Sequence, residues 1–454
     1  METDLLDDFE HVSSKQWKQQ IQYELNGSDY NETLIWESPE GIKVKPFYHF
    51  DESEVKYELE TNKKSFAVVQ NIFVHDVHKS NKRAVDSINR GADYICFTIE
   101  NKDIELQTLM KELPLEDNTY FFYLPFLSIN LIKRINKFII ETKYNCVIKV
   151  DPIGQLLKDG NWFENLEKDI AKLNSISEIS TIPFLTINAA LIQNAGAIMV
   201  QQLAYTLAHL NEYFNRIKNI NLPITIEIAV GSNYFFEISK IRALRLLFKT
   251  LAKEYNHELD CHIIATPTKR NKTIYDYNIN MLRTTTECMS AILGGANSIA
   301  NSAYDALYHK DNEFGDRISR NQLLILKNES YFDKVVNVAD GCYYIESLTE
   351  QLAEKSLLLF KEIEAKGGFI TQLIEGAIQK KISESAAKEQ DLFDNGSEVL
   401  LGTNKYANKN DKMKNDLELF PFVKQNPRKT LITPIIEKRL AEKLEQERLA
   451  SEDN

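Results

Sequence analysis

Apolar and polar positions alternate along this chain in a regular order from residue 65 onward. Helical periodicity lies between apolar, strand-like runs, for example from Trp162 to Leu173 and from Tyr234 to Tyr255. Strands that alternate with helices predict parallel βαβ units. The number of units matches a closed (β/α)8 barrel, so we predict a TIM-barrel fold. The predicted strands lie near residues 65–74, 93–99, 119–126, 145–152, 181–188, 223–230, 261–267 and 297–302.

An open, doubly wound α/β sheet has the same alternation of strands and helices and is the alternative fold. No GxGxxG sequence follows any of the predicted strands. The dinucleotide-binding fingerprint of that fold class is therefore missing, which favours the barrel.

The first 50 residues have the pattern of an arm rather than of a domain. Residues 13–16, Ser-Ser-Lys-Gln, match a capping box, and Gly27 suits the end of the helix that starts there. Trp17, Ile21 and Leu25 follow at intervals of four residues, and they give this helix one narrow apolar stripe.

Two short extended pieces follow that helix, at residues 34–36 and 42–44, with a proline and a glycine between them. One helix and two extended pieces cannot bury the two tryptophans of this segment, Trp17 and Trp36, by themselves. The arm must therefore pack on the main body or on another chain.

Helices continue after the barrel. Periodicity predicts two of them at residues 344–366 and 369–393, and Val399-Leu400-Leu401-Gly402 predicts a short strand. Residues 407–428 are polar and include two prolines, so we interpret them as a linker or a surface crossing.

The C-terminal segment predicts a last helix, with Thr433 as N-cap and Pro434 in its first turn. Ile436, Leu440 and Leu444 lie four residues apart, and the other face is charged. We expect a solvated helix that lies on the surface. The chain then divides into an arm (1–50), a (β/α)8 barrel (51–343), barrel-associated helices (344–406) and a C-terminal linker and helix (407–454).

Composition narrows the class of protein. The 454 residues are 43% hydrophobic and 26% charged, as in globular proteins, and the net charge of -12 argues against a nucleic-acid groove. The acidic start, Met1-Glu2-Thr3-Asp4, does not resemble a signal peptide. No apolar run approaches the ~20 residues that span a bilayer. We expect a cytoplasmic protein that binds neither nucleic acid nor membrane.

Cysteine usage agrees with a reducing compartment. The number of cysteines is odd and no CxxC pair occurs, so we expect reduced, buried thiols. A catalytic thiol stays open, although free cysteine is usually a small core residue. The five cysteines are Cys96, Cys146, Cys261, Cys288 and Cys342.

In a (β/α)8 barrel the reactive groups lie at the carboxyl ends of the strands. After the first strand, His75 and His78 with Asp76 have a spacing that suits metal ligands, but no further ligand accompanies them, which favours a surface turn and no metal site. Asp151 after the fourth strand is the best single carboxylate, although Asp before Pro is also a common turn former. Glu227 lies inside the sixth strand, where an interior ion pair is favoured over a catalytic base.

The remaining strand ends offer less chemistry. The turn after the fifth strand is apolar, from Ala189 to Ile192, and residues 294–298 at the eighth are small or amide-bearing. The seventh strand end holds Thr266, Thr268, Lys269 and Arg270. No strand end supplies a histidine with a carboxylate in a convincing catalytic arrangement, paired carboxylates or a Cys-His pair, and no GxxxxGK[ST] phosphate loop occurs. The residues alone predict a barrel whose mouth carries little chemistry.

Seven segments, taken in their order and spacing, match one known family. They are residues 40–48 (EGIKVKPFY), 186–197 (TINAALIQNAGA), 283–289 (RTTTECM), 317–322 (RISRNQ), 343–349 (YYIESLT), 365–368 (AKGG) and 402–406 (GTNKY). The ensemble resembles methylmalonyl-CoA mutase from about residue 5 to the C-terminus. The barrel of that family is a (β/α)8 barrel, in agreement with the strand count.

The chain departs from the catalytic members at the places that meet substrate. Catalytic chains resemble SGYHMQEAGA at the quoted turn, and Ala190 and Leu191 here replace their Tyr-His pair while Gln193 persists. After the eighth strand, residues 295–297 (GAN) stand where we expect a His-Thr-Gln run. Only the short, charged stretch 50–64 stands where catalytic chains insert a segment that meets the acyl-CoA.

Catalytic chains also continue into a cobalamin-binding domain marked by DxHxxG. Residues 76–81 (DVHKSN) are the nearest string, but they lack the glycine and lie at the first strand, so we reject them. We expect the cobalamin-binding domain to be absent from this chain.

The resemblance therefore implies the small, non-catalytic (beta) subunit of a heterodimeric mutase. Its large subunit would bind adenosylcobalamin and isomerise methylmalonyl-CoA and succinyl-CoA, a reaction of propionate metabolism. This chain would have no catalytic, cofactor-binding or metal-binding residues of its own. It would bind the large subunit through its arm, with Trp17, Ile21, Leu25, Trp36 and Tyr48 as contact residues.

Two other classes stay open. The chain could be an independent barrel enzyme of another reaction that uses Asp151, Glu227 or Lys269. It could also be a free-standing binding protein, for example for an acyl-CoA. A fold shared with enzymes does not by itself establish an activity.

Overall fold

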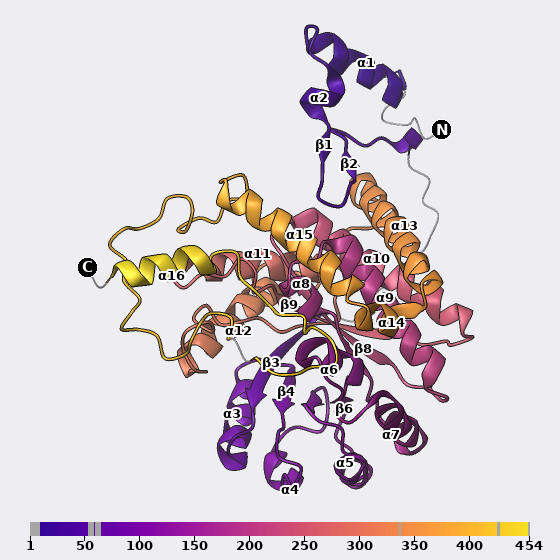
Figure 1. Cartoon of the computed structure of the whole chain (residues 1–454), viewed down its shortest axis with the longest axis vertical. Helices are drawn as coiled ribbons and strands as arrows, with labels where there is room; N and C mark the ends of the chain where they lie inside the picture. Colours follow the sequence, from indigo (N-terminus) through magenta and orange to yellow (C-terminus); the bar gives the residue numbers. More distant parts are fainter. Residues whose placement is uncertain (1–9, 53–58, 60–64, 336, 425–426, 453–454) are drawn as a thin grey trace, which may run out of the picture.

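The computed structural model describes residues 10–52, 59, 65–335, 337–424 and 427–452. Its main body is a sheet of eight parallel strands in the order β6-β5-β4-β3-β10-β9-β8-β7 (Figure 1). The strands are β3 (Ala67–Phe73), β4 (Tyr94–Thr98), β5 (Thr119–Tyr123), β6 (Cys146–Lys149), β7 (Thr186–Asn188), β8 (Ile224–Val230), β9 (Cys261–Pro267) and β10 (Ser298–Ile299).

The sheet closes between its two outer strands, β6 and β7. A parallel bridge joins Val150 to Leu185, and the N–H of Val150 donates to the Phe184 carbonyl over 3.2 Å. The N–H of Thr186 in turn donates to the Val150 carbonyl over 3.1 Å. The predicted (β/α)8 TIM barrel is confirmed, and all eight predicted strands are present.

Helices surround the barrel and cover the outer face of its strands. In β4, Ile95 and Phe97 are fully buried in the main core against the helices, whereas Cys96 belongs to a separate cluster inside the barrel. This alternation is the period-two pattern of a strand with two buried faces. The helices are α3 (Val77–Asn89), α4 (Leu106–Leu109), α5 (Ile129–Thr142), α6 (Pro152–Asp159), α7 (Leu166–Ile179), α8 (Ala190–Asn194), α9 (Met199–Arg216), α10 (Tyr234–Glu254), α11 (Ile279–Leu293) and α12 (Glu313–Asn328).

Three helices then pack on the barrel: α13 (Tyr343–Ala365), α14 (Gly368–Ile374) and α15 (Ala377–Asp394). The predicted helix at 344–366 is confirmed, but the single helix predicted at 369–393 is two helices. Gly376 has φ +77°, a left-handed conformation that interrupts the helix between α14 and α15. The helix predicted from Trp162 begins only at Leu166, because the Asn165 side chain accepts the N–H of Lys168 as an N-cap.

The strand predicted at 399–402 is absent, and the last helix is present but does not begin at Thr433 as predicted. Leu401 makes only an isolated bridge to Lys405, so there is no strand. The last helix, α16 (Glu442–Ser451), starts nine residues after Thr433, and the segment before it is extended. Its charged face is not solvated, because Glu442 and Glu445 are buried.

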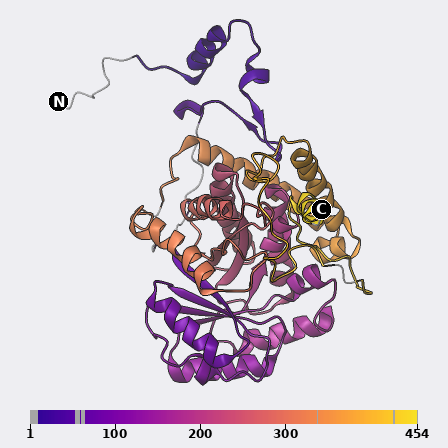
Figure 2. The same cartoon turned by 90° about the vertical axis from the view of Figure 1, so that its left-hand side faces the viewer.

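The N-terminal arm holds α1 (Ser14–Glu24), α2 (Tyr30–Leu34), the antiparallel pair β1 (Trp36–Glu37) and β2 (Lys43–Val44), and a 3-10 turn at Phe50–Glu52. The capping box between Ser13 and Gln16 is confirmed. In both views α1 and α2 project beyond the barrel, while the β1–β2 hairpin reaches back to it (Figure 2).

The five cysteines are free, and four of them are buried, whereas Cys342 is exposed. Burial raises the pKa of the thiols of Cys96, Cys146, Cys261 and Cys288, which disfavours a reactive thiolate at these positions. Among the described helices, none is long and apolar enough to cross a membrane.

Candidate functional site

The barrel interior is occupied by an ion pair between β6 and β8. Lys149 pairs with Glu227, lies 3.5 Å from the Cys96 sulfur, and stands 5.4 Å from the ring centre of Tyr123. Burial alone would lower the pKa of Lys149, but Cys96 and Glu227 outweigh it and the pKa is raised. The lysine is therefore a poor base or nucleophile. The interior ion pair that the sequence favoured for Glu227 is confirmed.

Aromatic side chains fill the barrel below this pair. The rings of Tyr94 and Phe121 lie 6.2 and 5.6 Å from the imidazole of His262, which shares a hydrogen bond of 2.9 Å with the Ser298 hydroxyl. Burial, aided by the charges of Arg245 and Lys149, lowers the pKa of His262 to about 4. His262 is thus neutral at physiological pH.

This burial gives a pH-dependent stability. Because the folded pKa of His262 lies below the unfolded value of ~6.5, its contribution is present above pH ~6.5 and is lost as the pH falls towards 4. We expect the wild type to lose about 2 kcal/mol more than His262→Gln between pH 7 and 4.5. Urea unfolding at several pH values measures this difference. The exposed His78, replaced by Gln, is the control, and equal pH profiles for His262→Gln and wild type would contradict the expectation.

Asp151 has a different role from the one a catalytic carboxylate would play. It caps α6 by accepting the N–H of Gly154 over 2.8 Å, and it accepts the N–H of Asn188 over 2.9 Å. His209 and Tyr213 of α9 contact the same carboxylate at 2.9 and 2.5 Å. Burial raises the pKa of Asp151, but the His209 charge and these hydrogen bonds outweigh it and hold the pKa below its ordinary value. The carboxylate ties α6, β7 and α9 together.

The apolar turn after β7 is part of the core. Leu191 is 6% exposed and Ile192 is fully buried, and both side chains belong to the main hydrophobic core. Gln193, the polar residue that persists in the turn, is also buried. Its carbonyl oxygen accepts from Lys240 over 3.0 Å, and its amide donates to Glu237 over 3.4 Å.

An extended strap, residues 431–440, crosses the mouth above this turn (Figure 1). Its backbone N–H groups donate to carbonyls of α6, of α8 and of the loop after β9. Ile435 donates to Leu157 over 2.8 Å, Lys438 to Asn194 over 3.0 Å, and Leu440 to Arg270 over 2.9 Å. The carbonyl ends of three barrel strands are thereby covered by the chain itself.

Lys269, a second candidate from the sequence, is engaged by the strap. Its ammonium lies 2.6 Å from the Glu437 carboxylate, which also accepts from the Asn194 amide over 3.0 Å. The side-chain oxygen of Asn194 accepts the N–H of Lys269 and the Thr268 hydroxyl, at 2.8 and 3.0 Å. Asp151, Glu227 and Lys269 therefore have separate partners and do not form one catalytic group.

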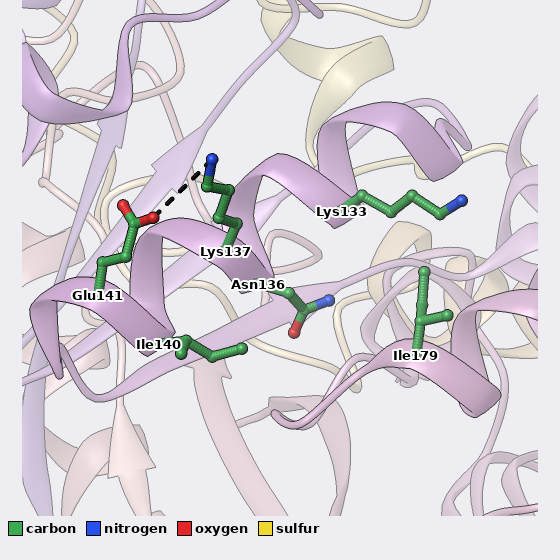
Figure 3. A pocket seen from close by; sticks show the side chains of 6 residues that line it. All are labelled: Lys133, Asn136, Lys137, Ile140, Glu141 and Ile179. Atoms are coloured by element: carbon green, nitrogen blue, oxygen red, sulfur yellow. Dashed lines mark ion pairs between the residues drawn. The ribbon is translucent and has the colours of Figure 1, made fainter.

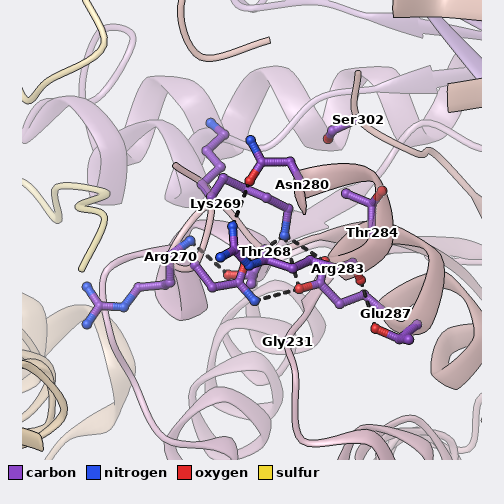
Figure 4. A network of polar contacts seen from close by, with 12 residues as sticks. Gly231, Thr268, Lys269, Arg270, Asn280, Arg283, Thr284, Glu287 and Ser302 are labelled. Atoms are coloured by element: carbon purple, nitrogen blue, oxygen red, sulfur yellow. Dashed lines mark hydrogen bonds and ion pairs between the residues drawn. The ribbon is translucent and has the colours of Figure 1, made fainter. Parts of the chain in front are cut away.

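Polar residues of the loop between β9 and α11 form a network below the strap (Figure 4). Lys272 pairs with Glu287 over 2.7 Å, and the Asn271 amide donates to Glu287 over the same distance. Burial lowers the pKa of Lys272 and raises that of Glu287, so the environment opposes charge on both. Arg283 donates to the Asn280 side chain at 3.0 Å. These bonds fix the loop.

Two other candidate sites, at residues 75–78 and 294–298, show no catalytic or metal-binding arrangement. Asp76 caps α3 by accepting the N–H of Lys79 over 2.8 Å, and the described residues hold no group of three or more His, Cys, Asp or Glu that could bind a metal ion. Residues 294–298 do not lie at the mouth as expected. They precede β10 and so lie at the amino end of the barrel, where Arg245 donates to the Gly295 carbonyl over 2.6 Å.

A groove of about 280 Å³ lies between α5 and the end of α7 (Figure 3). It is lined by Lys133, Asn136, Lys137, Ile140, Glu141 and Ile179. Ile140, Glu141 and Ile179 are at the carboxyl ends of their helices, which lie at the amino ends of the barrel strands. The groove is therefore on the face of a barrel that is associated with stability rather than catalysis.

The sequence pattern did not identify the residues that contact these candidates. Lys149, His209 and Lys240 were not singled out, although Lys149, the last residue of β6, lies only two residues before Asp151. A lysine inside an otherwise apolar strand was the available signal for the interior ion pair.

The family model for methylmalonyl-CoA mutase matches residues 104–449. The chain belongs to the methylmalonyl-CoA mutase family. The match includes every barrel strand from β5 onward, α13 to α15, and the strap. The resemblance read from the seven segments is therefore confirmed.

The chain spans a different share of the length of each relative in this family. The methylmalonyl-CoA mutase small subunit of Porphyromonas gingivalis is 30% identical over 442 residues, which covers 89% of this chain and 71% of the relative. The methylmalonyl-CoA mutase of Rhizobium meliloti is 33% identical, covering 61% of this chain and 39% of the relative. The human mitochondrial methylmalonyl-CoA mutase is 26% identical, covering 86% and 60%. The chain thus spans between 39% and 71% of the length of these mutases.

Proposed function

We propose that this chain is the non-catalytic small subunit of a heterodimeric, adenosylcobalamin-dependent methylmalonyl-CoA mutase. The large subunit would isomerise methylmalonyl-CoA and succinyl-CoA, and this chain would stabilise the complex in the cytoplasm. The observation that supports the proposal is that the interior and the mouth of the barrel are occupied by the chain's own residues. The ion pair of Lys149 with Glu227 occupies its interior, and residues 431–440 cross its mouth.

The candidate residues at the strand ends are not suited to acid–base catalysis. A general acid or base must lie within hydrogen-bond reach of substrate and have a free titratable group. At the turn after β7, where the resemblance places a Tyr-His pair, Ala190 has no such group and Leu191 is a buried hydrocarbon. Asp151, Glu227 and Lys269 are each held by a partner in the chain.

A corrinoid does not fit the described residues of this chain. The strap crosses the mouth, and the buried histidines are already engaged, His209 by Asp151 and His262 by Ser298. No histidine has the DxHxxG context that marks the family's cobalamin domain. We therefore propose that adenosylcobalamin binds to the partner subunit.

The arm supports a role in binding the large subunit. Trp17 and Trp36 are about half exposed, although large aromatic residues favour burial. Trp17 contacts Phe47 within the arm at 6.4 Å, and Ile21 and Leu25 are partly exposed on the same helix. Tyr48 is closer to the body, with its ring 5.1 Å from that of Tyr344. We propose that α1, with Trp36, presents the main contact to the partner.

The purified chain is expected to have no mutase activity, with or without adenosylcobalamin, because Ala190 and Leu191 stand where the resemblance places the Tyr-His pair. Turnover of methylmalonyl-CoA above a buffer control would contradict this. Dialysis against adenosylcobalamin followed by a visible spectrum should show no stoichiometric corrinoid. Co-expression with the large subunit should give a complex that co-elutes and is active.

Replacing Trp17 by alanine tests the arm. We expect the affinity for the large subunit to fall about 30-fold, since truncating a good aromatic anchor costs ~2 kcal/mol. The melting temperature of the isolated chain should stay near that of wild type. Tyr331→Ala, which removes an exposed aromatic outside the arm, is the matched control. A lower melting temperature with unchanged affinity would assign Trp17 to the chain's own packing.

A further inference from the structure

Helix α9 starts without a cap of its own. Its 18 residues are almost all buried, and its N-cap residue, Ile198, has no side-chain acceptor. The first N–H groups of a helix have no partner within the helix and must find one elsewhere. The Gln201 side chain accepts the N–H of Ile198 over 3.2 Å, which leaves the N–H groups of Met199 and Val200 to be satisfied.

Those two N–H groups bind a carboxylate from the arm. Glu40 lies at the tip of the β1–β2 hairpin, 159 residues earlier than Met199. One of its oxygens accepts the N–H of Met199 and the other that of Val200, each over 2.8 Å. A negative charge at a helix N-terminus is also favoured by the helix dipole. Glu40 thus supplies the cap that Ile198 cannot provide.

The hairpin and the residues after it also make apolar and aromatic contacts with the body. Val44 packs against the main core, and the rings of Tyr48 and Phe50 lie 5.1 and 6.4 Å from those of Tyr344 and Tyr343. Ile42, beside the tip, is fully buried, and the Trp36 ring contacts that of Phe236 in α10 at 5.8 Å. Beyond the hairpin, α1 and α2 project away from the barrel (Figure 2). The hairpin is therefore held against the body where Glu40, Ile42 and Trp36 meet it, and the segment after it is held through Tyr48 and Phe50.

We propose that Glu40 is a latch that performs two tasks at once: it caps α9, and it fixes the N-terminal arm in the position from which it meets a partner. The capping task follows from the contacts of Glu40 alone. The second task rests on the proposed function only for the identity of the partner, the large subunit. Loss of Glu40 frees the arm and frays α9 together, because both depend on one carboxylate.

Hydrogen exchange of the full-length chain tests the latch. In Glu40→Ala, the amides of Met199 and Val200 should exchange about tenfold faster, as for loss of an N-cap, and the amides of residues 36–48 should lose protection with them. Glu37→Ala, an exposed glutamate of the same hairpin, is the control and should change neither region. Glu40→Gln, which keeps one acceptor, replaces Glu40→Ala if the alanine variant does not fold.

A second substitution separates the two tasks. Ile198→Thr gives α9 an acceptor at its own N-cap and, with Gln201 in place, a capping box. In the double variant Glu40→Ala/Ile198→Thr, protection near residue 200 should return, while residues 36–48 stay exposed to exchange. If Glu40→Ala leaves either region unchanged, or if the double variant restores both, Glu40 is not the latch.

Binding to the large subunit then connects the latch to the proposed function. With the arm freed, both Glu40→Ala and the double variant should bind at least tenfold more weakly than wild type, and Glu37→Ala should bind normally. Wild-type affinity of the double variant would overturn the arm-positioning task. If wild type itself does not bind, the proposed function fails, while the exchange results still decide whether Glu40 caps α9.

Discussion

Replacing Glu445 by alanine should lower the free energy of unfolding by about 3–5 kcal/mol, although the sequence places this residue on the charged face of a terminal helix. Glu445 is fully buried in α16. Its carboxylate accepts the N–H of Ile274 over 2.9 Å and lies 2.7 Å from the Arg439 guanidinium. Arg439 is 3% exposed and also donates to the carbonyls of Lys272 and Pro421. Removing Glu445 leaves that buried charge without its counter-ion.

Urea unfolding of the full chain at neutral pH measures this loss. Glu447→Ala, an exposed glutamate two residues along the same helix, is the control and should change the stability by no more than about 0.5 kcal/mol. Equal stabilities for the two variants would show that α16 is the solvated surface helix expected from the sequence pattern.

Asp151→Asn is the second large effect, at about 3 kcal/mol of unfolding free energy, since hydrogen bonds to a buried charge are worth more than neutral ones. The carboxylate joins Gly154, Asn188, His209 and Tyr213. An asparagine amide facing the N–H of Asn188 or Gly154 would place donor against donor. Because the folded pKa of Asp151 is lowered, its stabilisation is complete above the unfolded pKa of ~3.9 and is lost only as the pH falls below it.

Thermal and urea unfolding at pH 7 measure this effect, with the exposed Asp103→Asn as the control. The result also separates two classes of protein. A catalytic base could be replaced with loss of activity and little loss of stability, as in an independent barrel enzyme. A variant of unchanged stability would contradict the structural role of Asp151.

The barrel could be predicted because each of its strands and helices is encoded by the pattern of residues within that element. Each strand is a short apolar run with clear punctuation, and each surrounding helix repeats the 3.6-residue period, so Ile95 and Phe97 face the helices as expected. The predicted helix boundaries were wrong where a single residue starts or interrupts a helix, as at Asn165 and Gly376. Local pattern does not encode whether a cap or a left-handed residue overrides the period.

The C-terminal segment failed for a different reason. Thr433-Pro434 and the spacing of Ile436 and Leu440 predict a helix, but the N–H groups of this segment bond to carbonyls of the barrel instead of to their own turn. The charges of Arg439 and Glu445 look like a solvated face because the sequence does not show that they pair with each other. Such tertiary bonds override helix propensity.

The site was predicted in outline and not in its contacts. Ala190 and Leu191 carry no titratable group in the turn after β7, which is visible in the sequence. Glu227 was rightly expected to be in an ion pair, but its partner, Lys149, comes from another strand. Glu40 appeared only as part of a family motif, because its contact with α9 joins residues 159 apart.

The strap also sets an order of events during folding. Helices α6 and α8 are synthesised long before residues 431–440, yet their carbonyls at Leu157 and Asn194 bond to them. Contacts between residues so distant in sequence form slowly, because the chain must close a long loop first. We expect the mouth of a newly made barrel to stay open until residues 431–440 have been synthesised and the strap has docked. Until then its loops are exposed to proteases and to chaperones that the finished molecule no longer meets.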